Sequence, residues 1–326
     1  MTLLLVLLCL VGCRSEEPAA RGIIAQTPAS EMYATTQEAL RTAGITQLTW
    51  GVTPYVTSDG DVEDRYRPMV KLVSERIATP IEVIAGQSYE DVETLLLSGQ
   101  IDVAVMSPYA YVRAQAKDKN IRAIASHIAN GTESYGAYIL AREESSIQQL
   151  ADLKGKRFGF VDKRSSSGWL FPASRMLDEG INPLTEVSGR FYGNHARVIA
   201  AIASGEVDAG ATYNAALREG RGAIRGAKNL RVIARTERIP YDAYVVRSGF
   251  PTEAILGLQK AISSVSTRDS TGREALEPLG DINGFIRVSD SHYRRVRDTE
   301  DRVRSLLDLP GGKLPDPMPA QEDTGP

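Results

Sequence analysis

The 326-residue sequence is poor in cysteine and histidine. Its two cysteines, Cys9 and Cys13, both lie at the N-terminal end, which excludes a disulfide framework, a CxxC metal site and a cysteine nucleophile further along. The three histidines, His127, His195 and His292, are far apart and match no metal-binding spacing. We therefore expect neither a metal nor a cofactor.

Motifs of the common enzyme classes are also missing. The chain has no GxSxG elbow and no Walker-type GxxxxGK[ST] loop. Ser165, Ser166 and Ser167 could supply a nucleophile with His195 as its base, and such a protein would hydrolyse phosphate esters. No third residue that would orient the base can be identified, so we predict that the protein is not an enzyme.

No apolar run is long enough to span a bilayer, which needs roughly 20 residues. The run at residues 3–11 fits instead the core of a secretory signal, although no lysine or arginine precedes it. Leu10-Val11-Gly12-Cys13 resembles a bacterial lipobox, whose cysteine receives lipid. Lipid on Cys13 would anchor the protein to a membrane surface without a spanning helix. The alternative is a buried N-terminal strand.

Length and composition indicate two modest domains between polar ends. We expect a signal at 1–13, a tether with one short helix at 14–45, and a disordered, proline-rich tail at 306–326. The formal net charge of −3 gives no sign of a nucleic-acid surface.

The body alternates between strand-like and helix-like segments, which predicts an α/β fold. Strands are expected at 48–52, 81–84, 101–106, 122–128, 135–141, 158–161, 189–192, 208–212, 230–236 and 240–246. Helices are expected at 66–77, 88–98, from 110, at 146–156, 169–179, 194–203, 251–265, 271–279 and 289–307.

Two segments repeat one pattern, a helix ending in Ser-Gly, a short polar pair and a strand. They are residues 97–104 and 203–210. The pattern predicts two α/β units, with lobe 1 at 46–141 plus 238–305 and lobe 2 at 142–237. Ligands of open α/β sheets bind at the carboxyl ends of the strands, and two units joined by two crossings can close on a ligand.

Residues 157–177 are the most informative segment. An apolar run ends at Asp162, the serine turn (residues 165–168) follows, and a helix-like segment comes next. The first N–H groups of a helix lack intrahelical partners and attract phosphate-like anions. Serine hydroxyls add donors, and Gly168 allows close approach of the backbone. The alternative is an ordinary helix cap followed by a loop.

Several short motifs then carry a resemblance to a known family. They are Gly51-Val52-Thr53-Pro54-Tyr55, Gly99-Gln100-Ile101-Asp102-Val103-Ala104 with Ser107-Pro108-Tyr109, Leu153-Lys154-Gly155-Lys156, the serine turn, Gly193-Asn194-His195, and Gly205-Glu206-Val207-Asp208-Ala209. In this order they resemble the phosphonate, phosphite and phosphate family of periplasmic substrate-binding proteins, the ligand receptors of ABC importers. The resemblance covers about residues 46–300.

The resemblance implies a type II two-lobed fold with the ligand between the lobes. Ser165, Ser166 and Ser167 would donate to the oxyanion together with the helix-start amides, and His195 would donate to another oxygen. Tyr55 and Tyr109 would line the cleft from lobe 1, and Asp208 and Tyr213 would lie near the remaining face of the ligand. Lys163 and Arg164 stand where the family has small residues, and they either attract the anion or point outward.

The resemblance also implies partners and a location. They are a small phosphorus oxyanion, an ABC permease and ATPase, and a membrane reached through lipid on Cys13, with the protein a monomer on the periplasmic or extracellular side. Two alternatives stay open. The chain could be the ligand-sensing subunit of a signalling system, or it could bind a sulfonate, carboxylate or pyrimidine.

Overall fold

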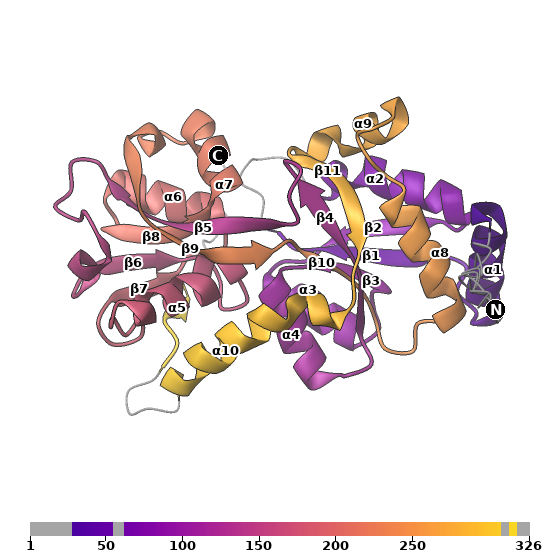
Figure 1. Ribbon diagram of the computed structural model, residues 1–326, viewed down its shortest axis with the longest axis horizontal. Helices are drawn as coiled ribbons and strands as arrows, with labels where there is room; N and C mark the ends of the chain where they lie inside the picture. The colour runs from indigo at the N-terminus through magenta and orange to yellow at the C-terminus, as the bar shows by residue number, and fades with distance from the viewer. Residues whose placement is uncertain (1–27, 55–61, 308–312, 318–326) are drawn as a thin grey trace, which may run out of the picture.

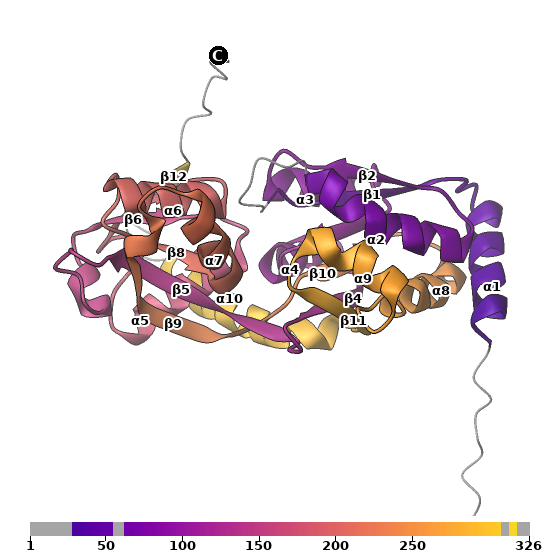
Figure 2. The same ribbon diagram turned by 90° about the horizontal axis from the view of Figure 1, so that it is seen from above.

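The computed structural model describes residues 28–54, 62–307 and 313–317 of the protein. They form two lobes side by side, each built on a six-stranded sheet (Figures 1 and 2). The expected signal, Cys13 and Tyr55 lie outside the described residues. Within the described ranges, no helix is long and apolar enough to cross a membrane.

Lobe 1 holds the sheet with strand order β11-β4-β10-β3-β1-β2. Its strands are β1 (Leu48–Val52), β2 (Ile81–Ala85), β3 (Val103–Met106), β4 (Arg122–Ala129), β10 (Ala243–Val246) and β11 (Ile282–Arg287). Its helices are α1 (Ala29–Thr42), α2 (Val62–Ile77), α3 (Tyr89–Leu97), α4 (Pro108–Lys117), α8 (Thr252–Ser263) and α9 (Ser270–Leu276). β1 pairs in parallel with β2 and β3, and β10 runs antiparallel between β3 and β4. In its core, the rings of Trp50 and Tyr244 meet edge to face at 5.8 Å.

Lobe 2 holds the sheet with strand order β12-β7-β6-β8-β5-β9. Its strands are β5 (Ser134–Arg142), β6 (Arg157–Phe160), β7 (Ser188–Phe191), β8 (Ala209–Tyr213), β9 (Leu230–Pro240) and β12 (Asp316–Pro317). Its helices are α5 (Phe171–Asp178), α6 (His195–Ser204) and α7 (Asn214–Ala223). Helix α6 packs closely on β8, because a Cβ at Gly210 would lie only 2.9 Å from Val198.

The expected lobe boundary at residue 141 is wrong. β5 pairs with β8 and β9, so it belongs to lobe 2, and the first crossing lies between β4 and β5. The hydrophobic run in β5 predicts a buried strand but carries no information on which sheet the strand joins. The return crossing lies between β9 and β10, close to the expected boundary at 238.

The chain also passes between the lobes a third time. Helix α10 (Arg294–Leu307) packs on α4 of lobe 1 and on α5 of lobe 2, and it runs along one side of both lobes in Figure 1. β12 then pairs with β7 in lobe 2. The expectation of a wholly disordered tail is therefore wrong for residues 313–317, where Leu314 packs against the core.

Most elements occur where the sequence predicts them, and the differences are local. The helix expected at 146–156 is only a 3-10 turn, Leu150–Leu153. Helix α7 and strand β11 were not predicted. The helix expected within the tether is α1, which packs on α8.

Candidate ligand-binding site

A cavity of about 100 Å³ lies between the lobes. The residues that line it come from both lobes and from the crossings, and they include aromatic, hydroxyl and ionisable side chains. They are Arg65, Tyr66, Tyr89, Ser107, His127, Ala129, Tyr135, Ser165, Ser166, Ser167, His195, Tyr213, Asn214, Ala215, Glu219, Tyr241, Asp242, Leu279, Asp281 and Ile282. The structure thus brings the three serines, His195 and Tyr213 together, as the sequence predicts.

The serine turn opens the helical segment that follows β6. A π-helical turn, η2 (Ser166–Leu170), leads directly into α5. Ser165 is the cap, because its Oγ accepts a hydrogen bond of 3.0 Å from the amide of Gly168. The Ser165 hydroxyl can still donate its hydrogen to an anion, and the amides of Ser166 and Ser167 begin the helical segment beside it.

Gly168 serves packing rather than contact with the ligand. A Cβ at this position would lie 2.3 Å from the Cβ of Val161, so the turn can lie against the end of β6 only with glycine here. Gly168 itself does not line the cavity. The expectation that Gly168 contacts the ligand is therefore wrong, and its role is to let the neighbouring serines lie against the end of β6.

His195 begins α6 and is almost fully buried, with 2% of its surface exposed. Burial lowers its pKa to about 3, so the ring is neutral at physiological pH. Nδ1 lies 2.9 Å from the Oγ1 of Thr212 on β8. When the Thr212 hydroxyl donates to Nδ1, the proton of the ring is on Nε2, which is the tautomer that can donate to an oxyanion.

Thr212→Val should weaken oxyanion binding by about three- to tenfold, because a buried ring nitrogen loses a hydrogen bond worth roughly 0.5–1.5 kcal/mol. Calorimetric titration with phosphate would measure this loss. Thr36→Val is the matched control, since Thr36 is equally buried and its hydroxyl bonds Met32 O on α1, away from the cavity. Equal affinities in the two variants would contradict the tautomer assignment.

Tyr109 contributes its backbone rather than its side chain. Its amide donates to the Oγ of Ser166 at 2.9 Å, which links α4 of lobe 1 to the serine turn. Burial, together with the charge of Glu300 on α10, raises the pKa of the Tyr109 phenol. Tyr109 is not among the described residues that line the cavity, so the expectation that it lines the cleft is wrong.

Asp208 is also not at the cavity. It precedes β8, and Tyr213 ends that strand, roughly 16 Å further along at about 3.3 Å per residue. Its carboxylate accepts from Arg157 Nη2 at 2.7 Å, and this partner lowers the pKa of Asp208. The aspartate thus joins the starts of two strands, whereas ligands bind at their carboxyl ends.

The structure adds several acidic and basic residues that the sequence did not identify, namely Arg65, His127, Glu219, Asp242 and Asp281. Asp242, in the return crossing, lines the cavity, and burial raises its pKa to about 7. His127 lines the cavity from β4, its ring lies 4.5 Å from that of Tyr241 at a tilt of 37°, and burial lowers its pKa to about 3, so the ring is neutral. Its Nδ1 has no hydrogen-bond partner among the described residues.

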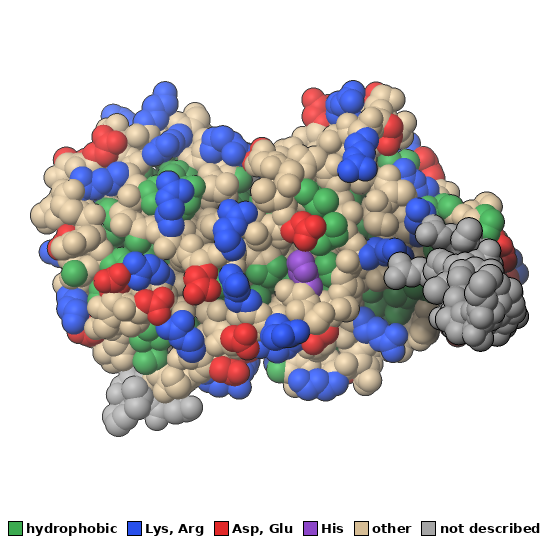
Figure 3. All heavy atoms as spheres, in the orientation of Figure 1, with side chains coloured by type: hydrophobic (Ala, Val, Ile, Leu, Met, Phe, Trp, Pro, Cys, Tyr) green, Lys and Arg blue, Asp and Glu red, His purple; other side chains and the backbone are tan. Residues whose placement is uncertain are grey.

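The cavity offers neutral donors more than positive charge. Arg65 is the one basic residue among the described residues that line it, and its Nε donates to Pro278 O at 2.7 Å. No group of side chains in the described ranges is arranged to hold a metal ion. On the outer face drawn in Figure 3, basic and acidic side chains are interspersed. Such a cavity suits a small anion that accepts several hydrogen bonds and carries one proton of its own.

The sequence matches the family described as the periplasmic substrate-binding protein of phosphonate ABC transporters over residues 50–293. The chain belongs to this family. Members of the family are extracytoplasmic and work with ABC permease and ATPase subunits; they are binding proteins rather than enzymes. The predicted family and the two-lobed fold are thereby confirmed.

Relatives of this family member support the assignment. The phosphate-import protein PhnD of Mycolicibacterium smegmatis is 29% identical over 277 residues, which cover 78% of this chain and 84% of that protein. A binding-protein component of a Pseudomonas aeruginosa phosphonate transporter has a TM-score of 0.71 at 19% identity, covering 79% of this chain and 86% of that one. PhnD1 of Prochlorococcus marinus in complex with methylphosphonate has a TM-score of 0.70 at 19% identity, covering 79% and 98%.

Proposed function

We propose that this family member is the ligand receptor of an ABC importer and binds a phosphorus oxyanion in the cavity between its lobes. The observation that carries the proposal is the convergence of the serine turn and His195 on one cavity. Three serine side chains at the start of a helical segment and an imidazole line one region, and each of these side chains can donate a hydrogen bond. Charge-assisted hydrogen bonds contribute roughly 1.5–3 kcal/mol each, so three or four contribute about 4.5–12 kcal/mol, a range that includes the roughly −8 kcal/mol of micromolar binding.

Asp242 points to the ligand's protonation state. A carboxyl group among oxyanion donors accepts a hydrogen from P–OH, or pairs with the ammonium of an aminoalkyl group. Phosphate, phosphite and phosphonate monoanions carry such a hydrogen, whereas sulfate at neutral pH does not. The names of the relatives agree with this class, since one is a phosphate-import protein and another holds methylphosphonate.

Binding is favoured over catalysis by the surroundings of His195. Among the described residues, its Nδ1 is paired with Thr212, and no hydrogen bond joins the ring to a serine of the turn. A serine nucleophile requires its base within hydrogen-bonding distance.

We also propose that lipid on Cys13 holds the receptor at the membrane. Radiolabelled palmitate should be incorporated into the wild type and not into a Cys13→Ser variant. Incorporation that persists in Cys13→Ser would refute this anchor.

A thermal-shift screen tests the ligand class. At about 100 times their Kd, phosphate, phosphite, methylphosphonate or 2-aminoethylphosphonate should stabilise the protein by about 2.7 kcal/mol, or roughly 5–10 °C. Sulfate is the matched control, because it has a similar size and no hydrogen for Asp242. A response to sulfate alone would refute the phosphorus ligand and favour the sulfonate alternative.

A further inference from the structure

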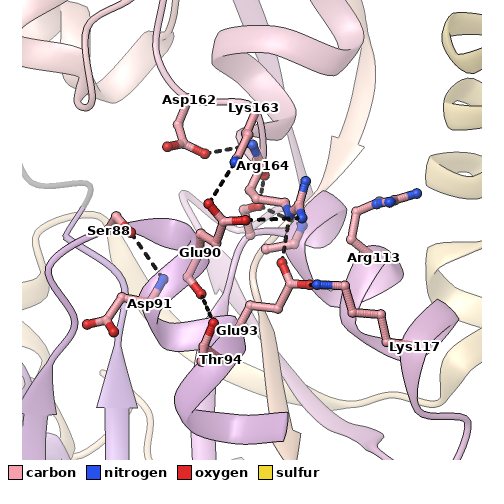
Figure 4. A network of polar contacts seen from close by, with 12 residues as sticks. Ser88, Glu90, Asp91, Glu93, Thr94, Arg113, Lys117, Asp162, Lys163 and Arg164 are labelled. Carbon is pink, nitrogen blue, oxygen red and sulfur yellow. Dashed lines mark hydrogen bonds and ion pairs between the residues drawn. The ribbon is translucent and has the colours of Figure 1, made fainter. Parts of the chain in front are cut away.

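A set of charged side chains connects the lobes beside the serine turn (Figure 4). Lys163 and Arg164 precede the turn in lobe 2, and Glu90 and Glu93 lie on α3 in lobe 1. Arg164 Nε donates to Glu93 Oε2 at 2.6 Å, and Lys163 Nζ lies 2.7 Å from Glu90 Oε2. Both cations are therefore directed at acidic side chains of the opposite lobe.

The inner of these pairs is deeply buried. The Glu93 side chain is 0% exposed and that of Arg164 is 11% exposed. Lys117 on α4 contacts the other Glu93 oxygen at 2.6 Å. A buried carboxylate is tolerated only when it is well paired and hydrogen-bonded. Since one partner comes from its own lobe and the other from lobe 2, the pairing of Glu93 is complete only when the serine turn is docked on lobe 1.

Two further hydrogen bonds between the lobes flank this pair, one to a backbone carbonyl and one from a backbone amide. Ser107 Oγ, at the start of α4, donates to the carbonyl of Arg164 at 2.6 Å. The Tyr109 amide donates to Ser166 Oγ at 2.9 Å. The side chain and carbonyl of Arg164 and the hydroxyl of Ser166 are thus all held by lobe 1, which fixes where the serine hydroxyls point.

We propose that Glu93 and Arg164 are positioning residues of the ligand site, which dock the serine turn on the start of α4 and hold it ready for an oxyanion. Glu90 and Lys163 add a second, half-exposed pair, and the Lys163 hydrogen bond lowers the pKa of Glu90. The inference rests on the proposed function for its effect on binding, whereas docking itself needs no ligand.

The Tyr109 amide provides a direct measure of docking. It lies in the first turn of α4 and has no acceptor within its own helix, so its protection depends on Ser166 in the other lobe. In Arg164→Met, hydrogen exchange at Tyr109 measured by NMR should be faster by about tenfold or more. The amide of Tyr111, which donates to Ser107 O inside the helix, serves as the reference and should not change.

The same variant should bind phosphate and methylphosphonate about tenfold more weakly by calorimetry, and Arg164→Lys should recover part of the loss because it keeps the charge. Arg247→Met is the matched control. Arg247 forms a comparably buried pair with Asp102 at 2.8 Å, but within lobe 1 and away from the cavity. In this control variant, the rate of hydrogen exchange at the Tyr109 amide and the affinity for phosphate should equal those of the wild type.

Unchanged exchange at Tyr109 in Arg164→Met would overturn the proposal. Faster exchange with unchanged affinity would also overturn it, because the pair would then be structural only. If the wild type bound neither phosphate nor methylphosphonate, the proposed ligand class would fail, while the exchange measurement would still decide whether the turn is docked by this pair.

The outer pair allows an independent test by charge exchange. Lys163→Glu and Glu90→Lys alone should each weaken phosphate binding, by about two- to fivefold at low salt, and the double variant should restore it. The double variant has the net charge of the wild type, so restoration separates the contact from a change in the local field. Failure of the double variant to recover would exclude the outer pair from the mechanism.

Discussion

His195→Ala should lower the affinity for phosphate by about 10- to 100-fold, since the variant loses one hydrogen bond to a charged ligand, worth roughly 1.5–3 kcal/mol. The ring is buried and neutral, and its Nδ1 is bonded to Thr212, so Nε2 is the nitrogen left for the ligand. Calorimetric titration of the purified protein would give the change in Kd directly.

The control for this prediction is the third histidine. His292 lies in the short 3-10 turn η5 (Asp290–Tyr293) before α10, is only partly buried, and does not line the cavity. His292→Ala should therefore bind phosphate within about twofold of the wild type. An unchanged Kd in His195→Ala, or an equal loss in both variants, would show that His195 does not contact the ligand.

Asp242→Asn should stabilise the ligand-free protein at about pH 8 and leave it almost unchanged below about pH 4. The folded-state pKa of Asp242 is raised to about 7, above roughly 3.9 in an unfolded chain. Between these values the folded state binds more protons, so its free energy of unfolding falls as the pH rises and levels off above about 7. Asparagine removes this loss, which is on the order of 4 kcal/mol at most.

Urea denaturation across this pH range would test the expectation. Asp301→Asn, at an exposed aspartate on α10, controls for the loss of one negative charge. A difference between Asp242→Asn and the wild type that does not grow with pH would contradict the raised pKa of Asp242.

Asp242→Asn should also show whether the preferred ligand carries an ammonium group. As the pH rises, ionised Asp242 adds negative charge beside the oxyanion, so the ratio of wild-type to Asp242→Asn Kd should increase for phosphate. For 2-aminoethylphosphonate the ratio should stay low, because the ammonium pairs with the carboxylate. Because the ligand titrates equally in both measurements, the ratio of the wild-type Kd to the Asp242→Asn Kd at each pH does not depend on the ligand's own pKa.

The serine turn was predictable because its signal is local. An apolar strand, consecutive serines and a helix start are all read within residues 157–177, and each part has its own physical meaning. The order of the other motifs placed His195 and Tyr213 at the same edge. Both lie at a carboxyl end of a strand or just after one, where ligands of α/β sheets bind.

Local sequence patterns do not predict the positions of three residues, Asp242, His127 and Asp208. Asp242 lies in the return crossing, and its raised pKa comes from burial that only the folded protein creates. His127 sits inside an apolar strand, where a histidine gives no indication of which cavity it faces. Asp208 is expected near the ligand only from the family resemblance, whereas its bond with the Arg157 amide places it at the beginning of β8, away from the cavity. The lobe to which β5 belongs is likewise decided by pairing that no single strand encodes.

The third passage of the chain between the lobes has a consequence for transport. Two crossing segments alone would form a flexible hinge. Here α10 also packs on both α4 of lobe 1 and α5 of lobe 2, and the segment after α10 pairs with lobe 2 through β12. We expect these contacts to limit how far the lobes can open, so that a larger share of the ligand-free protein resembles the ligand-bound form. Affinity benefits, because the competent fraction multiplies the intrinsic binding constant. A permease that works with such a receptor must then distinguish its ligand-bound form from its ligand-free form by local differences rather than by how far the lobes are closed.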